Sequence, residues 1–239
     1  TVQGEGAVLR ILAAGSAMPL EKLNLSHRNH ETLLEMAKHP HGLLLVVGPT
    51  GSGKTTTLHA VLGHLNKPER KIWTAEDPVE ITQPGLQQVQ MMPKIGFTFA
   101  TAMRAFLRAD PDIILIGEMR DKETASIGVE ASLTGHLVLS TLHTNSAPET
   151  ITRLLDLGLD PVNFSDALLG VLAQRLMRTL CGSCKESYTP EERDLNHLIE
   201  QFGQDVWEER GLKQEEWSFK RAVGCDACGG SGYRGRTGV

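Results

Sequence analysis

The sequence has no apolar run long enough to cross a membrane, few aromatic residues and no excess of positive charge. A membrane-spanning helix needs about 18 consecutive apolar residues, whereas the most apolar runs here, residues 43–47 and 113–116, have the length of strands. Aromatic residues make up 5% of the chain and the formal net charge is -5, which disfavours a basic, ring-stacking surface for nucleic acid. With 239 residues, of which 40% are hydrophobic and 22% charged, the chain can bury a core and is not expected to be disordered.

An initiator methionine and a signal-peptide pattern are also lacking. Thr1 is the first residue, and a glycine-rich stretch precedes Val239, so we expect a fragment of a longer protein. Composition divides the chain into three parts. They are residues 1–27, with one strand-like segment (Ala7–Leu12) and a linker; residues 28–180; and residues 181–239, where charge, cysteine and glycine dominate around an amphipathic segment near 191–202.

Cysteine is scarce, and its four copies occur as two Cys-x-x-Cys pairs, Cys181/Cys184 and Cys225/Cys228. A disulfide within such a short loop is usually redox-active rather than structural, and nothing else in the sequence points to secretion. Four thiolates in two such pairs are typical of a tetrahedral zinc site in a reducing cytosol. We therefore expect the four side chains to bind one structural Zn²⁺ ion in a small zinc-binding subdomain.

The middle part alternates apolar runs with helical periodicity, which predicts an α/β fold with a mostly parallel sheet. Helices are expected over residues 30–38, from residue 55 onward, and over residues 98–108, where Asp110-Pro111 ends the helix. The expected strands are residues 43–47, 72–75, 113–116 and 137–142.

Residues 48–55, Gly-Pro-Thr-Gly-Ser-Gly-Lys-Thr, fit the pattern G-x-x-x-x-G-K-[ST] between an expected strand and an expected helix. Glycines let successive backbone N–H groups curl around a phosphate, and the helix N-terminus adds its positive dipole end. Lys54 supplies a charge to the β- and γ-phosphates of ATP, and Thr55 offers its hydroxyl to Mg²⁺. The predicted nucleotide-binding residues are Gly48, Pro49, Thr50, Gly51, Ser52, Gly53, Lys54, Thr55 and Thr56.

Acidic residues near strand ends are candidates for holding the metal. Parallel α/β sheets bind ligands beyond the carboxyl ends of their strands. Glu118 follows the strand at 113–116 and is the expected Mg²⁺ ligand together with Thr55. Asp112 precedes that strand, so it is expected about 20 Å from the phosphates at ~3.3 Å per residue.

A second acidic group, residues 76–80, follows the expected strand at 72–75 and reaches the same edge. Clustered carboxylates repel one another unless a cation or a water network is shared. Glu80 is the preferred base for the attacking water, with Glu76 and Asp77 supporting it, although the sequence leaves the choice between Glu80, Glu76 and Glu118 open.

Two histidines and three arginines complete the predicted site. His143 ends the expected strand at 137–142 and can reach a γ-phosphate, whereas His136 begins that strand and should lie farther away. Arg104 and Arg108 are four residues apart on one expected helix, and Arg120 follows Glu118 by two residues. Arginine supplied across a subunit interface can raise turnover by ~10³-fold.

These segments resemble, in order, the motifs of the secretion ATPase family, which powers type II secretion and the extension and retraction of type IV pili. The cysteine pairs are similar to the metal-binding insertion of the type II secretion and pilus-extension branches, an insertion that retraction motors generally lack. The resemblance covers about residues 40–180, with a Walker A loop at 48–55, an acidic box at 74–80, a Walker B segment at 110–121 and a histidine box at 133–147.

The resemblance implies a RecA-like P-loop ATPase that uses Mg²⁺ and forms a homo-hexamer on the cytoplasmic side of the inner membrane. There it would act through a cytoplasmic docking protein and an inner-membrane platform protein that adds pilin-like subunits to a fibre. The residues carried over are Lys54 and Thr55 for phosphate and metal, Glu80 and Glu118 for the acidic roles, His136 and His143 for the histidine box, and Arg104, Arg108 and Arg120 for sensing or completing the site.

The sequence departs from the family in three ways. Residues 4–12 resemble the last strand of an N-terminal domain that is otherwise missing, and the helical part expected after Val239 is missing too. The 40 residues between Cys184 and Cys225 form a longer insertion than the family leads us to expect.

Two other classes of protein remain open. One is a RecA-like, nucleic-acid-dependent ATPase or helicase with a zinc module, supported only by a short basic cluster at Arg175, Arg178 and Lys185. The acidic balance and the few aromatic residues oppose it, so we expect no nucleic-acid partner. The other is a structural fragment whose ATP site only holds a shape, which the intact Lys54 and Thr55 oppose.

Overall fold

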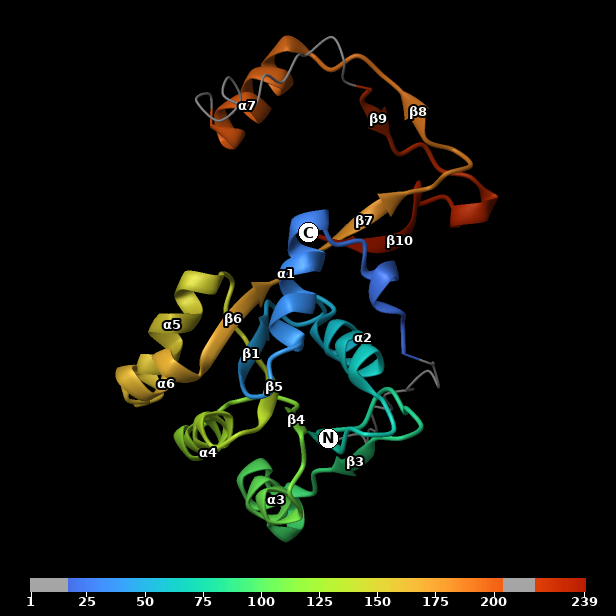
Figure 1. The fold of residues 1–239 in the computed structure, drawn as a ribbon. Helices are drawn as coiled ribbons and strands as arrows, with labels where there is room; N and C mark the ends of the chain where they lie inside the picture. The colour runs from blue at the N-terminus through green and yellow to red at the C-terminus, as the bar shows by residue number, and fades with distance from the viewer. Residues whose placement is uncertain (1–16, 204–217) are drawn as a thin grey trace, which may run out of the picture. The chain divides into compact units, whose positions relative to one another are not determined.

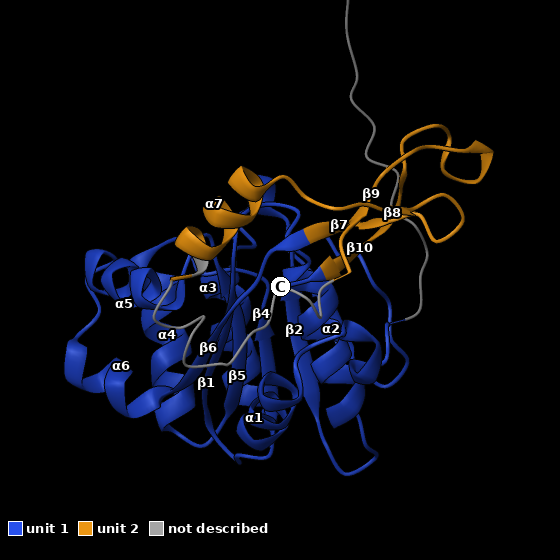
Figure 2. Cartoon of the chain, turned by 90° about the horizontal axis from the view of Figure 1, so that it is seen from above, with its two compact units in different colours: residues 1–176, 238–239 blue, residues 177–237 orange. Residues whose placement is uncertain are grey.

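The computed structural model describes residues 17–203 and 218–239, which belong to two compact units (Figure 2). The first unit comprises residues 1–176 and 238–239, and the second comprises residues 177–237. The change of unit therefore falls shortly before the boundary expected at residue 180, and the last two residues return to the first unit. The predicted strand at Ala7–Leu12 lies outside the described residues.

A six-stranded parallel sheet forms the centre of the first unit, with the strand order β3-β2-β4-β5-β1-β6 (Figure 1). The predicted α/β class is confirmed, and the four predicted strands are present to within one residue at each end. Strands β3 and β6 were not predicted. The strands are β1 (Gly42–Val47), β2 (Ile72–Glu76), β3 (Gln87–Gln90), β4 (Ile113–Ile116), β5 (Leu137–Leu142) and β6 (Leu168–Ala173).

The central strands are continuous apolar runs because both faces of the sheet are covered. Every residue of β1 is buried. Its alternate side chains enter two separate hydrophobic clusters, with Leu43, Leu45 and Val47 on one side and Leu44 and Val46 on the other.

Helices α1 (His27–Ala37) and α2 (Lys54–Leu65) supply the cluster around Leu44, and the later helices supply the cluster around Leu45 (Figure 1). The later helices are α3 (Phe99–Phe106), α4 (Lys122–Leu133), α5 (Ala147–Asp156) and α6 (Pro161–Ala167). The helix predicted over residues 98–108 is shorter than expected. It ends at Phe106, and Arg108 lies in the 3₁₀ turn η3 (Leu107–Ala109). Two further 3₁₀ turns are η1 (Leu20–Leu23) and η2 (Pro93–Ile95).

The second unit consists of short ribbons and one helix. Strand β7 (Leu176–Leu180) pairs with β10 (Tyr233–Gly238), and β8 (Glu186–Ser187) pairs antiparallel with β9 (Lys220–Arg221). The predicted amphipathic segment is helix α7 (Glu192–Phe202). The second cysteine pair spans the 3₁₀ turn η5 (Asp226–Cys228), with Cys225 just before the turn and Cys228 at its end. Among the helices that the structure describes, none combines the length and the apolar composition that a bilayer crossing requires.

Candidate functional site

The loop that joins β1 to α2 has the backbone of a phosphate-binding loop. Gly48, Gly51 and Gly53 have φ angles of 148°, 79° and 89°, which residues with a side chain rarely adopt. A Cβ atom on Gly48 would lie 2.2 Å from the carbonyl oxygen of Gln174. This position therefore requires glycine for two reasons, the φ angle and the lack of space for a side chain. The loop leads into the N-terminus of α2, where unpaired N–H groups and the helix dipole favour an anion.

Lys54 is the first residue of α2, and its side chain is folded over this loop. The ammonium donates to the carbonyl oxygens of Gly48 at 2.8 Å and Pro49 at 3.1 Å. Burial lowers the pKa of Lys54, and the negative charge of Glu118 opposes that shift. A partly desolvated ammonium at the mouth of an N–H-lined loop is suited to bind phosphate oxygens.

Glu118 is held at the carboxyl edge of the sheet by the strands on either side of β4. The N–H of Gly117 donates to the carbonyl oxygen of Ala75 in β2 at 2.8 Å, and the hydroxyl of Thr141 in β5 donates to the carbonyl oxygen of Gly117 at 2.7 Å. A Cβ atom on Gly117 would lie 3.1 Å from the Ala75 oxygen. Glycine therefore allows the close approach that positions the acid after it.

The Glu118 carboxylate has one occupied oxygen and one without a hydrogen bond. Its Oε1 lies 2.5 Å from a guanidinium nitrogen of Arg120, and this hydrogen bond raises the pKa of Arg120. Its buried Oε2 makes no hydrogen bond and lies 3.6 Å from Nε2 of His143. A buried acceptor without a donor has unused capacity, and the Thr55 hydroxyl lines the same cavity. This oxygen donor set fits Mg²⁺.

Glu76 lies at the same edge, but its carboxylate is already fully engaged. It accepts hydrogen bonds from Thr74 Oγ1 at 2.6 Å, Gln88 Nε2 at 3.0 Å and His59 Nε2 at 3.0 Å. Burial alone would raise the pKa of Glu76, yet these hydrogen bonds outweigh it, so the pKa lies below its usual value. Glu76 is therefore suited to fix the end of β2 rather than to bind a cofactor.

The partner of Glu76, His59, is completely buried on α2. Its Nδ1 accepts from Gln83 Nε2 at 2.8 Å, which places the ring proton on Nε2, where it is donated to Glu76. Sequence analysis did not select His59 or Gln83, since each is recognisable only by a partner far along the chain. The one available signal is that His59 follows Thr55 by one helical turn.

A cavity of about 310 Å³ brings the predicted residues together. It lies where the P-loop meets the carboxyl ends of β2, β4 and β5, as the rule for parallel sheets predicts. The polar residues that line it are Thr50, Lys54, Thr55, His59, Glu76, Asp77, Glu80, Glu118, Arg120, Thr141 and His143. Asp112 lies at the opposite end of β4, where its carboxylate accepts from the N–H of Lys71 at 2.7 Å.

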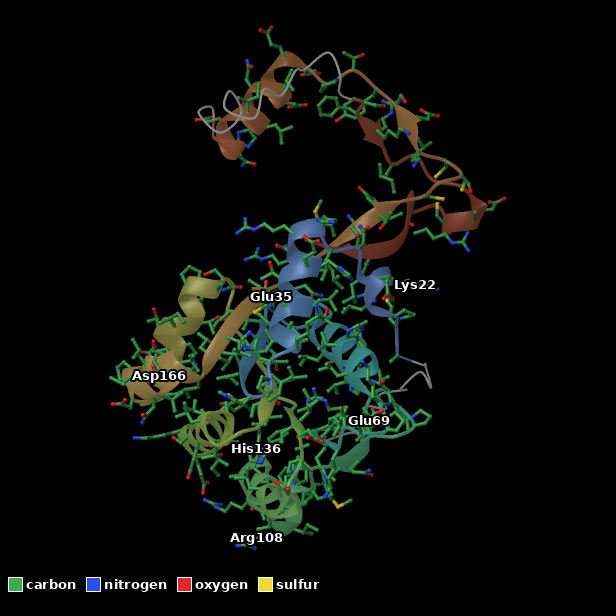
Figure 3. All side chains as sticks on the ribbon, viewed as in Figure 1. Lys22, Glu35, Glu69, Arg108, His136 and Asp166 are labelled. Carbon is green, nitrogen blue, oxygen red and sulfur yellow. The ribbon has the colours of Figure 1, made fainter. Side chains whose placement is uncertain are left out.

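Outside the predicted phosphate-binding segment 48–56, three predicted residues do not line this cavity. His136 precedes β5, and its ring hydrogen-bonds to the carbonyl oxygen of Ala131 at 3.0 Å, so it lies away from the cavity of its own chain. Arg104 pairs with Glu123 at 2.5 Å. Arg108 is exposed, and Figure 3 shows it beyond α3, pointing away from the sheet. The reason is geometric: His136 lies at the amino end of its strand, Arg104 lies on the exposed side of α3, and Arg108 lies exposed in the turn η3 after that helix ends.

In the second unit the four cysteines converge. All four Sγ atoms lie within 4.8 Å of one another, with Cys181 to Cys225 at 4.0 Å and Cys184 to Cys228 at 3.8 Å. A disulfide would bring two sulfurs to about 2.05 Å, whereas a tetrahedral site with metal–sulfur bonds of ~2.3 Å places them ~3.8 Å apart. The four thiols are free, so the cluster could hold a metal ion.

Backbone N–H groups donate to the sulfurs of Cys184 and Cys228. They favour a thiolate at Cys228, whereas at Cys184 the N–H of Gly224 is outweighed by burial and the neighbouring thiols, which raise the pKa of Cys184 to about 11. Gly224 donates to Cys184 Sγ at 3.4 Å, and both Cys225 and Gly232 donate to Cys228 Sγ at 3.2 Å. The N–H of Cys225 makes the largest contribution to lowering the pKa of Cys228 to about 6, against the opposing effect of burial. A thiolate at neutral pH is the form that binds a metal.

Comparisons with known proteins identify the family to which the chain is similar. Residues 1–239 match the family described as Type II/IV secretion system protein. The chain is 48% identical over 237 residues to the type II secretion system ATPase E of Vibrio cholerae, covering 99% of this chain and 45% of that protein. It is 46% identical over 240 residues to the type IV pilus assembly ATPase PilB of Thermus thermophilus, covering 99% of this chain and 26% of that protein. The chain thus spans less than half the length of these relatives.

Solved structures agree on the fold. The pilus retraction motor PilT with bound ADP has a TM-score of 0.63 and 35% identity, covering 84% of this chain and 61% of that chain. The ATPase DotB of Legionella pneumophila has a TM-score of 0.61 and 30% identity, covering 69% of this chain and 47% of that one. The predicted RecA-like core is confirmed, and the chain belongs to the type II/IV secretion system protein family.

Proposed function

We propose that this chain is the ATP-hydrolysing part of a motor for type II secretion or type IV pilus assembly. One observation carries the proposal: a single cavity joins the Lys54 ammonium and the Thr55 hydroxyl of the P-loop to Glu118, whose buried Oε2 makes no hydrogen bond. These are the groups that phosphoryl transfer to water requires, namely a phosphate cradle, a cation site and an acid.

The chain's own residues would divide the reaction as follows. The P-loop N–H groups and Lys54 bind and orient the phosphates, and Thr55 with Glu118 would hold Mg²⁺. When bound, Mg²⁺ neutralises charge on the β- and γ-phosphates. Glu80 lines the cavity together with Glu76 and would accept a proton from the attacking water. Arg120 and His143 flank Glu118, so both can meet developing negative charge.

The assembled machine is also part of the proposal. A homo-hexamer on the cytoplasmic side of the inner membrane would couple hydrolysis to a docking protein and a platform protein that adds pilin-like subunits to a fibre. Arg104 and Arg108 point away from their own cavity, so we propose that they complete the site of a neighbouring subunit. Hydrolysis would then depend on assembly.

In the second unit, the proposed ligand is one structural Zn²⁺ ion held by Cys181, Cys184, Cys225 and Cys228. Sulfur separations of 3.8 and 4.0 Å support it, because they match the edges of a zinc–thiolate tetrahedron. Four protein ligands leave no open position, so the ion would stabilise the unit and not take part in hydrolysis.

The direct test is Mg²⁺-dependent phosphate release by the full chain, measured for the parent, Lys54→Ala and Glu118→Gln. Loss of the Lys54 charge should remove nearly all turnover, and Glu118→Gln should be nearly as severe. Lys38→Ala, an exposed lysine at the end of α1, is the matched control. If Lys54→Ala keeps more than half of the parent activity, the phosphate site is misplaced.

Two additions to the same assay separate the classes of partner. The cytoplasmic domain of the platform protein should stimulate turnover, and single-stranded DNA should not. Stimulation by DNA alone would favour the nucleic-acid-dependent ATPase instead.

A subunit-mixing experiment tests the arginines. Lys54→Ala subunits mixed with Arg108→Ala subunits should recover part of the activity, since mixed assemblies contain intact composite sites. The specific activity of the parent should also rise with protein concentration. No recovery, together with constant specific activity over a hundredfold dilution, would contradict action across an interface.

A further inference from the structure

Gln174 lies directly after β6 and forms hydrogen bonds to the P-loop and to the residues just before and just after it. Its side-chain amide donates to the carbonyl oxygen of Ser52 at 2.7 Å, and its side-chain oxygen accepts from the hydroxyl of Thr57 at 2.7 Å. The residue is only 8% exposed. Ser52 belongs to the loop and Thr57 to the first turn of α2, so one carboxamide ties the loop to the helix that follows it.

The backbone of Gln174 supports the other end of the same loop. Its N–H donates to the carbonyl oxygen of Val47 at 2.8 Å, just before the loop begins. Its carbonyl oxygen occupies the place where a Cβ atom of Gly48 would otherwise lie, and its side-chain nitrogen is 2.8 Å from the Cβ position of Gly53. The glycines of the loop are therefore needed for Gln174 as well as for the turn itself.

A loop that binds phosphate through its N–H groups also needs hydrogen-bond donors for its carbonyl groups, and Gln174 supplies one. When successive N–H groups point inward to an anion, the carbonyl groups between them point outward and need donors of their own. A glutamine side chain carries an NH₂ group that donates and a carbonyl oxygen that accepts, both in one plane. At position 174 the donor meets the Ser52 carbonyl and the acceptor meets the Thr57 hydroxyl, whereas a glutamate of the same shape would oppose an oxygen to the Ser52 carbonyl.

We propose that Gln174 is a positioning residue that holds the P-loop in its phosphate-binding shape before the nucleotide arrives. This inference rests on the proposed function. A loop without this support populates other conformations, and the apparent dissociation constant rises in proportion to the lost binding-competent fraction. Bound phosphates restore the shape, because they supply partners for the inward N–H groups.

Loss of Gln174 should therefore weaken nucleotide binding and leave turnover at saturating ATP nearly unchanged. In Gln174→Ala and in Gln174→Glu, the dissociation constant for Mg-ADP should rise about tenfold. At saturating ATP, turnover should stay within about twofold of the parent, since the phosphates then hold the loop. Thr57→Val keeps the contact to Ser52 and should raise the dissociation constant less than either change at Gln174.

The experiment is titration of the full chain with Mg-ADP by calorimetry, with turnover at saturating ATP as a second measurement. Leu33→Ala, a buried change in α1 away from the loop, controls for general loss of stability. It should lower the unfolding temperature without changing the affinity for Mg-ADP.

Three results would overturn the inference. The first is unchanged affinity in both Gln174 variants, and the second is an equal loss of affinity in Leu33→Ala. The third is that the parent chain itself does not bind Mg-ADP, which would overturn the proposed function and this inference with it.

Discussion

The two units of the chain differ in what stabilises each of them internally. The first unit has a hydrophobic cluster on each face of its sheet, and the buried members of both clusters lie between residues 20 and 167. In the described part of the second unit, only Cys181 and Gly232 are buried. One unit therefore owes its stability to apolar burial, whereas the described part of the other buries too little apolar surface for a core of this kind, and we expect it to depend on the proposed metal site.

Removal of the proposed metal site should have the largest effect, and it should destabilise the second unit but not the first. In Cys181→Ser/Cys225→Ser, we expect rapid protease cleavage within residues 177–237 while the first unit keeps its resistance, because structural zinc contributes about 10–16 kcal/mol to comparable small units. Limited proteolysis followed by mass spectrometry measures this, with Ser183→Ala as the control between two of the ligands. A second unit that stays resistant in the double variant and in excess chelator would contradict a metal-dependent fold.

A substitution that creates a cavity beside the sheet tests how far the first unit depends on apolar burial. Leu45→Ala removes a fully buried side chain of β1, and the free energy of unfolding should fall by about 2–5 kcal/mol. Urea unfolding followed by circular dichroism gives the value. Val223→Ala, in the second unit and 50% exposed, should change it by less than about 0.5 kcal/mol. If both substitutions lowered the free energy of unfolding equally, apolar burial would not distinguish the first unit from the second.

The same difference explains how much of the fold the sequence could predict. Strands β1, β4 and β5 are apolar runs because they are buried on both faces, and their bounds were predicted to within one residue. Strand β3 has the sequence Gln-Gln-Val-Gln at the edge of the sheet. It forms only because its backbone pairs with β2, with Gln87 opposite Trp73, and such long-range pairing leaves no periodic signal.

Prediction of the site had a similar limit. One rule, that ligands bind at the carboxyl ends of parallel strands, selected Glu118 and His143 and set Asp112 aside. The same rule placed His136 far from the phosphates, and the family resemblance then moved it back toward them. The supporting residues His59 and Gln174 were missed, since the contact from Thr57 to Gln174 joins residues 117 positions apart.

A smaller effect within the first unit concerns pH. The pKa of Glu76 lies below its ordinary value of 4.5 in the folded chain. Its charge therefore stabilises the fold fully above about pH 4.5, and this contribution is lost as the pH falls through the lower, folded value. At pH 7, Glu76→Gln should destabilise the first unit by about 1–3 kcal/mol, and the difference from the parent should shrink below pH 4.5.

Hydrogen exchange of the amides in α2 and β2, measured at pH 7 and near pH 4, reports this change locally. Glu69→Gln, an exposed carboxylate labelled in Figure 3, is the control and should show no such difference. A destabilisation by Glu76→Gln that does not change with pH would contradict a charged Glu76 in the folded chain.

The smallest expected effect lies in the second unit, where a single surface contact should be measurable because so little else holds the unit together. The guanidinium carbon of Arg178 in β7 lies 4.1 Å from the ring centre of Tyr233 in β10. At exposed sites a cation over an aromatic ring contributes about 0.5–1 kcal/mol, and binding of the proposed metal would be coupled to folding of the unit. Arg178→Gln should therefore weaken zinc affinity about two- to fivefold, as measured by competition with a chelator. Arg234→Gln removes the same charge from the neighbouring position in β10 and should have a smaller effect. Equal losses in the two variants would mean that the unit responds to net charge and not to this contact.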